Sequence, residues 1–412
     1  MRKPILIIGT FDTKGAEYAF LREQIITLGG EVLTVNVGVL GSSDLFPVDI
    51  ETDEVVRETG ADLASLRQER DRGKAIKIVS QAAAAIVSRL YDEGQFAGII
   101  GMGGSGGSTV VTSAMRALPY GVPKVCVSTV AGGDTSPYVG AKDVTMIPAI
   151  TDVAGVNRIS RTIFTRAAGA VVGMVAAVPP TAADDRPIIV ASMFGNTTEC
   201  VDACREKLAQ TGYEVLVFHA TGNGGQTMES LIDEGMADAC LDITTTEWAD
   251  EICGGMLSAG NDRLSAAGRA GIPHLIVPGC VDMVNFGPMH TVPQQFKDAG
   301  RLFYEWNPSV TLMRTNVDEN RRLGEIFAGK ANAATGPVAI LLPLRGVSIL
   351  DGDGQSFCDR QADRAMFKAI RDHADPQVPI FELDANINDT AFSDRAVEVM
   401  LDLISQTKCG RQ

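Results

Sequence analysis

The chain has 412 residues, which is more than one hydrophobic core usually serves, so its length predicts two or three domains and favours two. An apolar content of 45% and a charged content of 21% exclude a disordered or fibrous protein. A formal net charge of −15 excludes broad affinity for nucleic acid, because a phosphate backbone requires a surface rich in lysine and arginine.

The sequence also lacks the features of a membrane protein and of a disulfide-bonded protein. The apolar run from Ala167 to Val178 is too short to cross a bilayer, because Pro179 and Pro180 end it. The eight cysteines form no Cys-x-x-Cys pair and no cluster with histidine, which disfavours a zinc site and a disulfide framework. We therefore expect a cytoplasmic protein with reduced thiols and no contact with membranes or nucleic acid.

Two copies of one strand, helix and strand pattern occur along the chain. Residues 3–38 align without a gap on residues 186–221, and each copy reads apolar run, polar turn, amphipathic stretch, glycine, apolar run. The apolar positions of the two amphipathic stretches recur at helical steps and are Tyr18, Leu21, Ile25, Val201, Cys204 and Leu208. We expect these side chains to face a sheet in both halves.

The repeat continues further along the chain, but the first half carries extra residues. The run 121–127 resembles the run 271–277, but these two runs are separated by fewer residues along the chain than the first pair of copies. The first half therefore contains extra residues before this run, and we place them within residues 42–77. Buried apolar strands that alternate with helices predict an α/β fold with parallel sheets covered on both faces.

The polar, proline-containing stretch 178–185 is the natural linker, so we predict domains at residues 1–180 and 181–412. The elements expected near the end of the second domain are a strand at 338–342, a helix at 361–373, a strand at 380–383 and a helix at 396–404.

The first candidate ligand site follows the first buried strand and consists of Gly9, Thr10, Phe11, Asp12, Thr13 and Lys14. Ligands of parallel sheets bind at the carboxyl ends of strands, where amides at the start of a helix, two hydroxyls and the Lys14 ammonium would hold a phosphate. Asp12 would hold Mg²⁺ directly or through water. Alternatively, Asp12 or Thr13 only caps the helix and Lys14 is solvated.

The second candidate site is a glycine-rich turn after the strand that begins at Gly98, and it consists of Gly103, Gly104, Ser105, Gly106, Gly107, Ser108 and Thr109. Such a density of glycine lets the backbone approach a ligand closely, whereas a tight turn packed on the sheet would need only one or two. Gly101, Gly103 and Gly106 match G-x-G-x-x-G, but no acidic residue stands clearly placed to bind a ribose. The turn is no Walker loop either, because no Gly-Lys-Ser/Thr follows it.

Two further residues of the first half stand in a small polar loop after the strand at 124–127. Thr129 and Asp134 are candidates for contact with the same ligand, and Asp134 is a second candidate for a metal or ribose. A local turn hydrogen bond explains Asp134 equally well.

The second half offers candidate acid, base and positioning groups in glycine-rich or polar loops after its strands. They are His219, Glu229, Asp282, His290 and Arg345. The histidines and carboxylates would transfer protons or position a substrate, and Arg345 would bind a carboxylate or phosphate. A purely structural role is as good an interpretation of each one, and their spacing reveals no triad.

Three of these segments together, 8–14, 101–108 and 219–225, resemble the ATP-binding domain family named after the plant protein that confers resistance to tomato mosaic virus. The resemblance extends over essentially the whole chain, and the bacterial members of that family are largely uncharacterised. It implies two Rossmann-like domains, a homodimer, and ATP with Mg²⁺ in the first domain, bound by residues 9–14 and 103–109, with Thr129 and Asp134 nearby. It implies no particular reaction.

Three functions fit these observations. The leading hypothesis is an ATP-dependent enzyme that acts on a small metabolite in a cleft between the halves, with its catalytic groups at His219, Glu229, His290 and Arg345. The second is a nucleotide-regulated binding protein without chemistry, because no nucleophile is recognisable. The third is a nicotinamide-dependent oxidoreductase, which rests only on the G-x-G-x-x-G match.

Overall fold

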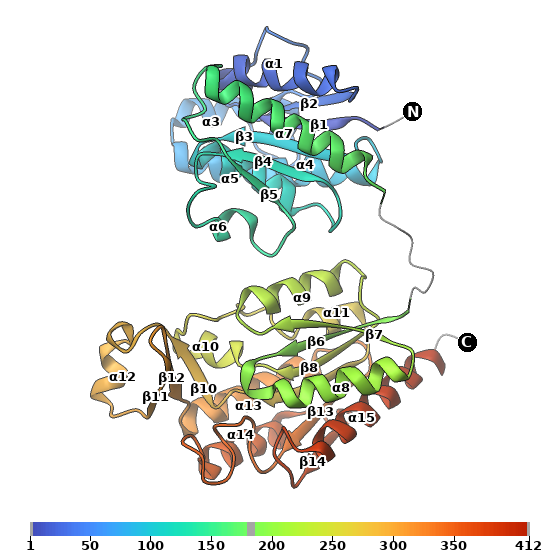
Figure 1. The fold of residues 1–412 in the computed structure, drawn as a ribbon, viewed down its shortest axis with the longest axis vertical. Coiled ribbons are helices and arrows are strands. Elements are labelled where there is room, and N and C mark those ends of the chain that lie inside the picture. Colours follow the sequence, from blue (N-terminus) through green and yellow to red (C-terminus); the bar gives the residue numbers. More distant parts are fainter. Residues whose placement is uncertain (1–2, 179–185, 410–412) are drawn as a thin grey trace. The chain divides into compact units, whose positions relative to one another are not determined.

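The computed structural model describes residues 3–178 and 186–409. The chain divides into two compact units, Met1–Thr181 and Ala182–Gln412, and each is described by itself (Figure 1). The predicted boundary near residue 180 and most of the predicted linker fall within residues 179–185, outside the described residues.

The first unit is built on a five-stranded parallel sheet in the order β2-β1-β3-β4-β5. Its strands are β1 (Ile5–Gly9), β2 (Val32–Asn36), β3 (Gly98–Gly103), β4 (Lys124–Ser128) and β5 (Thr145–Pro148). All five strands are parallel, but the order in which the chain adds strands reverses between β1 and β3. The helices that follow these two neighbouring strands, α1 and α5, therefore lie on opposite faces of the sheet. Doubly wound sheets of this order bind ligands at that switch point.

Helices cover both faces of this sheet (Figure 1). They are α1 (Phe11–Thr27), α2 (Thr52–Arg57), α3 (Leu63–Glu69), α4 (Arg72–Asp92), α5 (Ser105–Arg116), α6 (Ser136–Val139) and α7 (Arg158–Ala176). Helices α1 and α7 pack on one face and α4 and α5 on the other. Tyr18, Leu21 and Ile25 are fully buried beneath α1, which confirms the predicted helical stripe.

The second unit repeats this architecture with one more strand, in the order β14-β13-β9-β8-β6-β7. Its parallel strands are β6 (Ile188–Met193), β7 (Glu214–His219), β8 (Ala239–Thr244), β9 (His274–Gly279), β13 (Val338–Pro343) and β14 (Ile380–Leu383). In each unit the second strand in chain order is an edge strand that pairs with the first: β2 pairs with β1, and β7 pairs with β6. The predicted α/β fold with two parallel sheets related by an internal repeat is therefore confirmed.

Helices also cover both faces of the second sheet. The helical segments are η1 (Gly195–Thr197), α8 (Thr198–Gln210), α9 (Asn223–Asp233), α10 (Glu247–Cys253), α11 (Ala266–Ala270), η2 (Met289–Thr291), α12 (Gln294–Asp298), α13 (Val317–Asn332), α14 (Arg360–His373) and α15 (Thr390–Cys409). Val201, Cys204 and Leu208 of α8 are buried as predicted. The predicted strands and helix between 338 and 383 agree with the structure to within one residue, whereas α15 begins earlier and ends later than predicted.

A small antiparallel sheet in the second unit was not predicted. Its strands are β10 (Met283–Phe286), β12 (Val310–Arg314) and β11 (Phe303–Asn307), in that order. The turn between β11 and β12 contains Pro308, and the Asn307 side chain accepts the N–H of Ser309 at 2.8 Å. An Asn-Pro-Ser turn between two apolar runs is a hairpin signal in the sequence.

Neither unit contains a membrane-spanning helix within residues 3–178 and 186–409, since none there is long and apolar enough. The cysteines whose side chains are described are all free thiols, and most are buried.

The hydroxyl of Tyr18 joins β1 and β3 at the switch point. It donates to the carbonyl of Met102 at 2.7 Å and accepts the N–H of the same residue at 2.8 Å, while the carbonyl of Ile8 lies 3.0 Å away. A Cβ atom on Gly9 would lie 1.9 Å from the Tyr18 ring, so only glycine fits there. Burial raises the pKa of Tyr18, which keeps the hydroxyl neutral and able to donate.

We predict that Tyr18→Phe destabilises the first unit by about 1–3 kcal/mol, because the substitution leaves the buried N–H of Met102 without its acceptor. Calorimetric unfolding measures this, and both tryptophans, Trp248 and Trp306, belong to the second unit, so their fluorescence should report an unchanged transition. Tyr91→Phe is the matched control, since that ring is only partly buried. Equal stability of the two variants would contradict the role of the hydroxyl.

Candidate functional site

A cavity of about 990 Å³ lies at the carboxyl ends of β1 and β3 in the first unit. The residues that line it from the two predicted loops are Thr10, Thr13, Lys14, Gly104, Ser105, Gly106 and Gly107. These loops are about ninety residues apart in the chain, and the parallel pairing of β1 with β3 brings them together. The two phosphate-binding candidates therefore form one site.

The start of α5 gives this cavity unused hydrogen-bond donors. Gly104 is the N-cap residue and provides no side-chain cap, so the N–H groups of Ser105, Gly106 and Gly107 have no partner within the helix. A Cβ atom on Gly103 would lie 2.9 Å from the Cα of Gly107, so glycine is required for the tight turn. An anion is stabilised at such a terminus by the free amides and the helix dipole.

Four cationic side chains line the same cavity: Lys14, Arg67, Arg70 and Arg72. Lys14 donates to the carbonyl of Val153 and Arg67 to the carbonyl of Val39, and neither forms an ion pair with a described residue. Arg70 and Arg72 form no ion pair with any residue in the described ranges 3–178 and 186–409. The Nη2 atom of Arg72 lies 3.5 Å from the position that a Cβ on Gly106 would take, beside the start of α5.

Positive charge beside a helix N-terminus is unfavourable unless an anion is present. Of the two carboxylates on the cavity wall, Asp71 accepts the N–H of Lys74 at 3.0 Å and thereby caps α4. The other, Asp152, has no ion-pair partner in the part of the chain that the structure describes. Arg70 adopts a left-handed backbone conformation, with φ of 53°, which is uncommon for a residue other than glycine. Among the described residues, four cationic side chains and two carboxylates line the cavity, so its net charge is that of an anion-binding site.

The cavity also has an apolar wall, and the side chains that form it are Val37, Val39, Leu40, Leu66, Ala75, Ile76, Val79 and Val110. Three of these residues, Leu66, Ala75 and Ile76, and all three arginines come from α3, α4 and the turn between them, within the extra segment 42–77 that the repeat comparison identified. Sequence reasoning missed the arginines because that segment has no glycine-rich turn. Their signal is three arginines within Arg67–Arg72.

Phe11 and Asp12 of the first predicted loop do not line the cavity. Phe11 is buried in the core, with its ring centroid 4.9 Å from that of Tyr18, and its N–H donates to Asn36. Asp12 accepts the N–H of Leu40 at 2.8 Å through one oxygen, and its other oxygen is buried with no donor among the described residues. Asp12 does not line the cavity, so the geometry does not favour it as the Mg²⁺ ligand that the sequence predicted.

The remaining residues predicted for this ligand have other surroundings. Ser108 is buried and shares a hydrogen bond of 2.5 Å with Ser128, while Thr109 donates to the carbonyl of Ser105. Thr129 lines a separate, smaller cavity. Asp134 is exposed and accepts both the hydroxyl and the N–H of Ser136, which hold its pKa below its usual value. The local-turn interpretation of Asp134 describes this geometry.

In the second unit, a protein carboxylate fills the glycine-rich turn before α9. Glu247 accepts the N–H groups of Gly222 and Gly225 at 3.0 and 3.1 Å. A Cβ atom on Gly224 would lie 1.9 Å from the carbonyl oxygen of His219, so close packing explains this glycine. The turn that the sequence suggested for substrate binding is therefore occupied from within.

Glu229, a predicted acid or base, belongs to a buried ion-pair network. Its carboxylate accepts Nη1–H of Arg263 at 3.0 Å and the N–H groups of Leu264 and Ala266, both at 2.7 Å. Arg263 is 1% exposed and also binds Asp242 and Glu247. With its oxygens used in this way, Glu229 caps α11 and balances Arg263 rather than facing a substrate.

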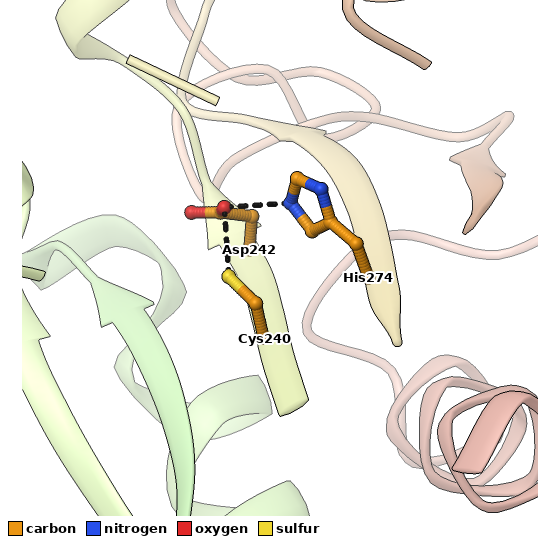
Figure 2. Close-up of side chains that lie close together, drawn as sticks. All are labelled: Cys240, Asp242 and His274. Atoms are coloured by element: carbon orange, nitrogen blue, oxygen red, sulfur yellow. Dashed lines mark hydrogen bonds and ion pairs between the residues drawn. The ribbon is translucent and has the colours of Figure 1, made fainter. Parts of the chain in front are cut away.

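Three potential metal ligands also meet in this network, as Figure 2 shows: Cys240, Asp242 and His274, with ligand atoms within 4.8 Å of one another. One oxygen of Asp242 accepts from His274 at 2.9 Å and from Cys240 at 3.2 Å, and the other binds Arg263. Burial would raise the pKa of Asp242, but Arg263 and His274 hold it well below its usual range. Burial raises the pKa of Cys240, so the thiol stays protonated. The hydrogen-bonding atoms of Asp242 are therefore satisfied by His274, Cys240 and Arg263 without a metal ion.

The other candidates of the second unit do not form one cluster with Glu229. His219 is exposed, with its ring 5.4 Å from that of Phe194, and His290 is exposed in η2. Arg345 is exposed near Asp353 and lines a cavity of about 370 Å³. Among the described residues, that cavity is not lined by His219, Glu229 or His290. Asp282 is buried, accepts the Ser348 hydroxyl at 2.8 Å, and has its pKa raised to about 6 by burial.

The sequence matches one protein family over nearly its whole length. The N-terminal domain of the uncharacterised protein family UPF0261 matches residues 3–180, and the C-terminal domain of that family matches residues 186–404. The chain belongs to the UPF0261 family. A UPF0261 protein of Clostridium tetani is 44% identical over 98% of this chain and 100% of its own length.

The ToMV resistance protein Tm-1(GCR237) of Solanum lycopersicum is 35% identical over 98% of this chain, which covers 56% of that protein. This confirms the resemblance to the family of the tomato mosaic virus resistance protein. Among solved structures, the glycosyltransferase SsfS6 of Streptomyces sp. SF2575 aligns over 98% of this chain and 96% of its own, with 12% identity and a TM-score of 0.20. So low a score carries no argument about function.

We predict that Arg263→Met destabilises the second unit by about 3–5 kcal/mol, because it leaves three buried carboxylates without their cation. Urea unfolding followed by the fluorescence of the buried Trp248 measures the change. Arg269→Met is the control, since it removes only the half-exposed pair with Asp233, which contributes about 0–1 kcal/mol. Similar losses for both variants would show that the network is not a stabilising centre.

Proposed function

We propose that the first unit binds ATP together with Mg²⁺ in the 990 Å³ cavity, and that the protein is an ATP-dependent enzyme acting on a small metabolite. One observation carries this proposal: an open helix N-terminus, four cations and an apolar wall line a single cavity at the switch point of the sheet. Its volume lies within the range of about 300–1,000 Å³ for small-molecule sites.

The apolar and the polar lining of the cavity suit the two parts of a nucleotide. The apolar side chains offer a surface for a base, and the N–H groups of Ser105 to Gly107 with the arginines offer donors for phosphates. Mg²⁺, bound with the nucleotide, would neutralise part of the phosphate charge. The Thr10 and Thr13 hydroxyls on the cavity wall are oxygen ligands of the kind that Mg²⁺ accepts in nucleotide sites.

The absence of a recognisable nucleophile is compatible with catalysis, because phosphoryl transfer depends mainly on positioning and on charge stabilisation. The nicotinamide alternative receives little support. Gly101, the first glycine of its pattern, is buried in β3, where a Cβ atom would lie 2.6 Å from the carbonyl oxygen of Ile8. Gly103 is likewise explained by its contact with Gly107.

We further propose that the protein is a cytoplasmic homodimer. The free thiols of the described cysteines fit a reducing compartment. Sedimentation velocity distinguishes a dimer from a monomer of 43.6 kDa.

We predict that the double variant Arg70→Met, Arg72→Met binds MgATP at least about 100-fold more weakly than the wild type, because each of the two lost charged hydrogen bonds contributes about 1.5–3 kcal/mol and every 1.4 kcal/mol is about tenfold in affinity. Isothermal titration calorimetry measures the affinity. The control is Arg57→Met, which removes an exposed arginine of the same unit that pairs with Asp53 outside the cavity.

A wild-type protein that does not bind MgATP would refute the proposal. Equal affinities of the wild type and the double variant would place the phosphates elsewhere. Binding without any turnover of ATP in the presence of metabolite mixtures would favour the nucleotide-regulated binding protein.

A further inference from the structure

A second cavity, of about 540 Å³, adjoins the first one in the same unit. It lies at the carboxyl ends of β4 and β5 and is lined by Thr129, Gly132, Pro148, Ala149, Ile150, Thr151 and Asp152. Asp152 lines both cavities. The two spaces therefore share one acidic residue on their walls.

Helix α1 holds the loop that carries Asp152. The Lys14 ammonium donates to the carbonyl of Val153, and the Glu17 carboxylate accepts the N–H of Gly155. Lys14 also lines the first cavity, so the loop is anchored at the phosphate-binding side of that cavity. Within the described residues Asp152 has no ion-pair or hydrogen-bond partner, so its oxygens are available to a ligand.

The backbone before Asp152 is strained. Ile150 has a φ of 67°, which is a rare conformation for a β-branched residue, and the N–H of Thr151 bonds to the carbonyl of Ala149 at 2.7 Å across it. Such strain costs about 1–3 kcal/mol and occurs mainly at functional sites. The Ile150 side chain is 70% exposed and thus contributes little burial to offset it.

The second cavity has polar groups without partners but no cation. The Thr151 hydroxyl is buried and has no hydrogen-bond partner among the described residues, and Thr129 adds an exposed hydroxyl. No lysine or arginine lines this cavity within those residues, and Asp152 would repel an anion. Pro148, Ala149 and Ile150 supply apolar contacts. These surroundings suit a small uncharged molecule that carries hydroxyl groups on a carbon skeleton.

We propose that this second cavity binds the phosphoryl acceptor, a small uncharged hydroxyl compound, and that Asp152 is its general base. The inference rests on the proposed nucleotide site in the first cavity. It places the acceptor within the first unit, beside the phosphates, and not at the residues of the second unit that the sequence suggested.

The reaction balances with the groups present. The acceptor oxygen attacks the γ-phosphorus, so an O–P bond forms while the bond from the γ-phosphorus to the β,γ-bridging oxygen breaks. The acceptor proton passes to the Asp152 carboxylate and then to solvent, and ADP leaves as the second product. Water in the acceptor position gives ADP and inorganic phosphate by the same step.

The test measures ADP release from MgATP by the full chain with water alone and with glycerol as the acceptor, and ³¹P NMR identifies phosphorylated glycerol. We expect Asp152→Asn to lower the rate at saturating ATP about 100-fold or more, as for the loss of a general base. We expect its ATP affinity, measured separately by calorimetry, to stay that of the wild type. Thr151→Val should raise the KM for glycerol severalfold through one lost hydrogen bond, again without changing ATP affinity.

The matched control is Asp92→Asn, which neutralises an exposed carboxylate at the end of α4 outside both cavities and should leave the rate unchanged. Equal rates for Asp152→Asn and the wild type would overturn the inference, as would a wild type that binds ATP but releases no ADP with either acceptor. A higher Mg²⁺ requirement for ATP binding by Asp152→Asn would make the residue a metal ligand and also overturn it. Failure of the wild type to bind ATP would overturn both this inference and the proposed nucleotide site.

Discussion

The contact between Tyr18 and Gly9 fixes the packing on which the candidate site of the first unit depends. The buried hydroxyl of Tyr18 is bonded to the backbone of β3, and its ring occupies the space that a side chain on Gly9 of β1 would need. These contacts hold the carboxyl ends of β1 and β3 at a defined separation. The starts of α1 and α5 follow directly from those strand ends, so the cavity, its free amides and its lysine depend on this packing.

The two units share the same sheet order, but the glycine-rich turns at the starts of α9 and α5 have different surroundings. In the second unit Glu247 occupies the glycine-rich turn before α9, and Arg263 compensates the carboxylates around it. In the first unit no carboxylate fills the start of α5 in the described residues, and arginines from the extra segment approach it instead. In the second unit the N–H groups of the turn are thus bonded to Glu247, whose charge Arg263 balances. In the first unit, more cationic side chains than carboxylates line the cavity at the start of α5 among the described residues. This asymmetry is the physical reason why the proposed ligand site lies in the first unit.

Much of the site could be predicted, because glycine-rich turns after buried strands have few purely structural explanations. Thr10, Thr13, Lys14 and three glycines of the α5 turn, Gly104, Gly106 and Gly107, line the cavity. Individual roles were less predictable. Asp12 and Glu229 look alike as carboxylates in polar loops, yet one bonds to a neighbouring turn and the other to a buried arginine. Those partners are distant in the chain, so no local pattern reveals them.

The sequence by itself determined the α/β class, the repeat and the two strand-to-helix turns that line the site, since these depend on local periodicity and on glycine and proline. Only the tertiary structure decided which side chains meet. Arg72 lies beside the start of α5, and Arg67 and Arg70 line the same cavity. The loop of Asp152 contacts Lys14, again through folding of segments far apart in the chain. Sheet pairing sets those distances, and pairing depends on the whole core rather than on any segment.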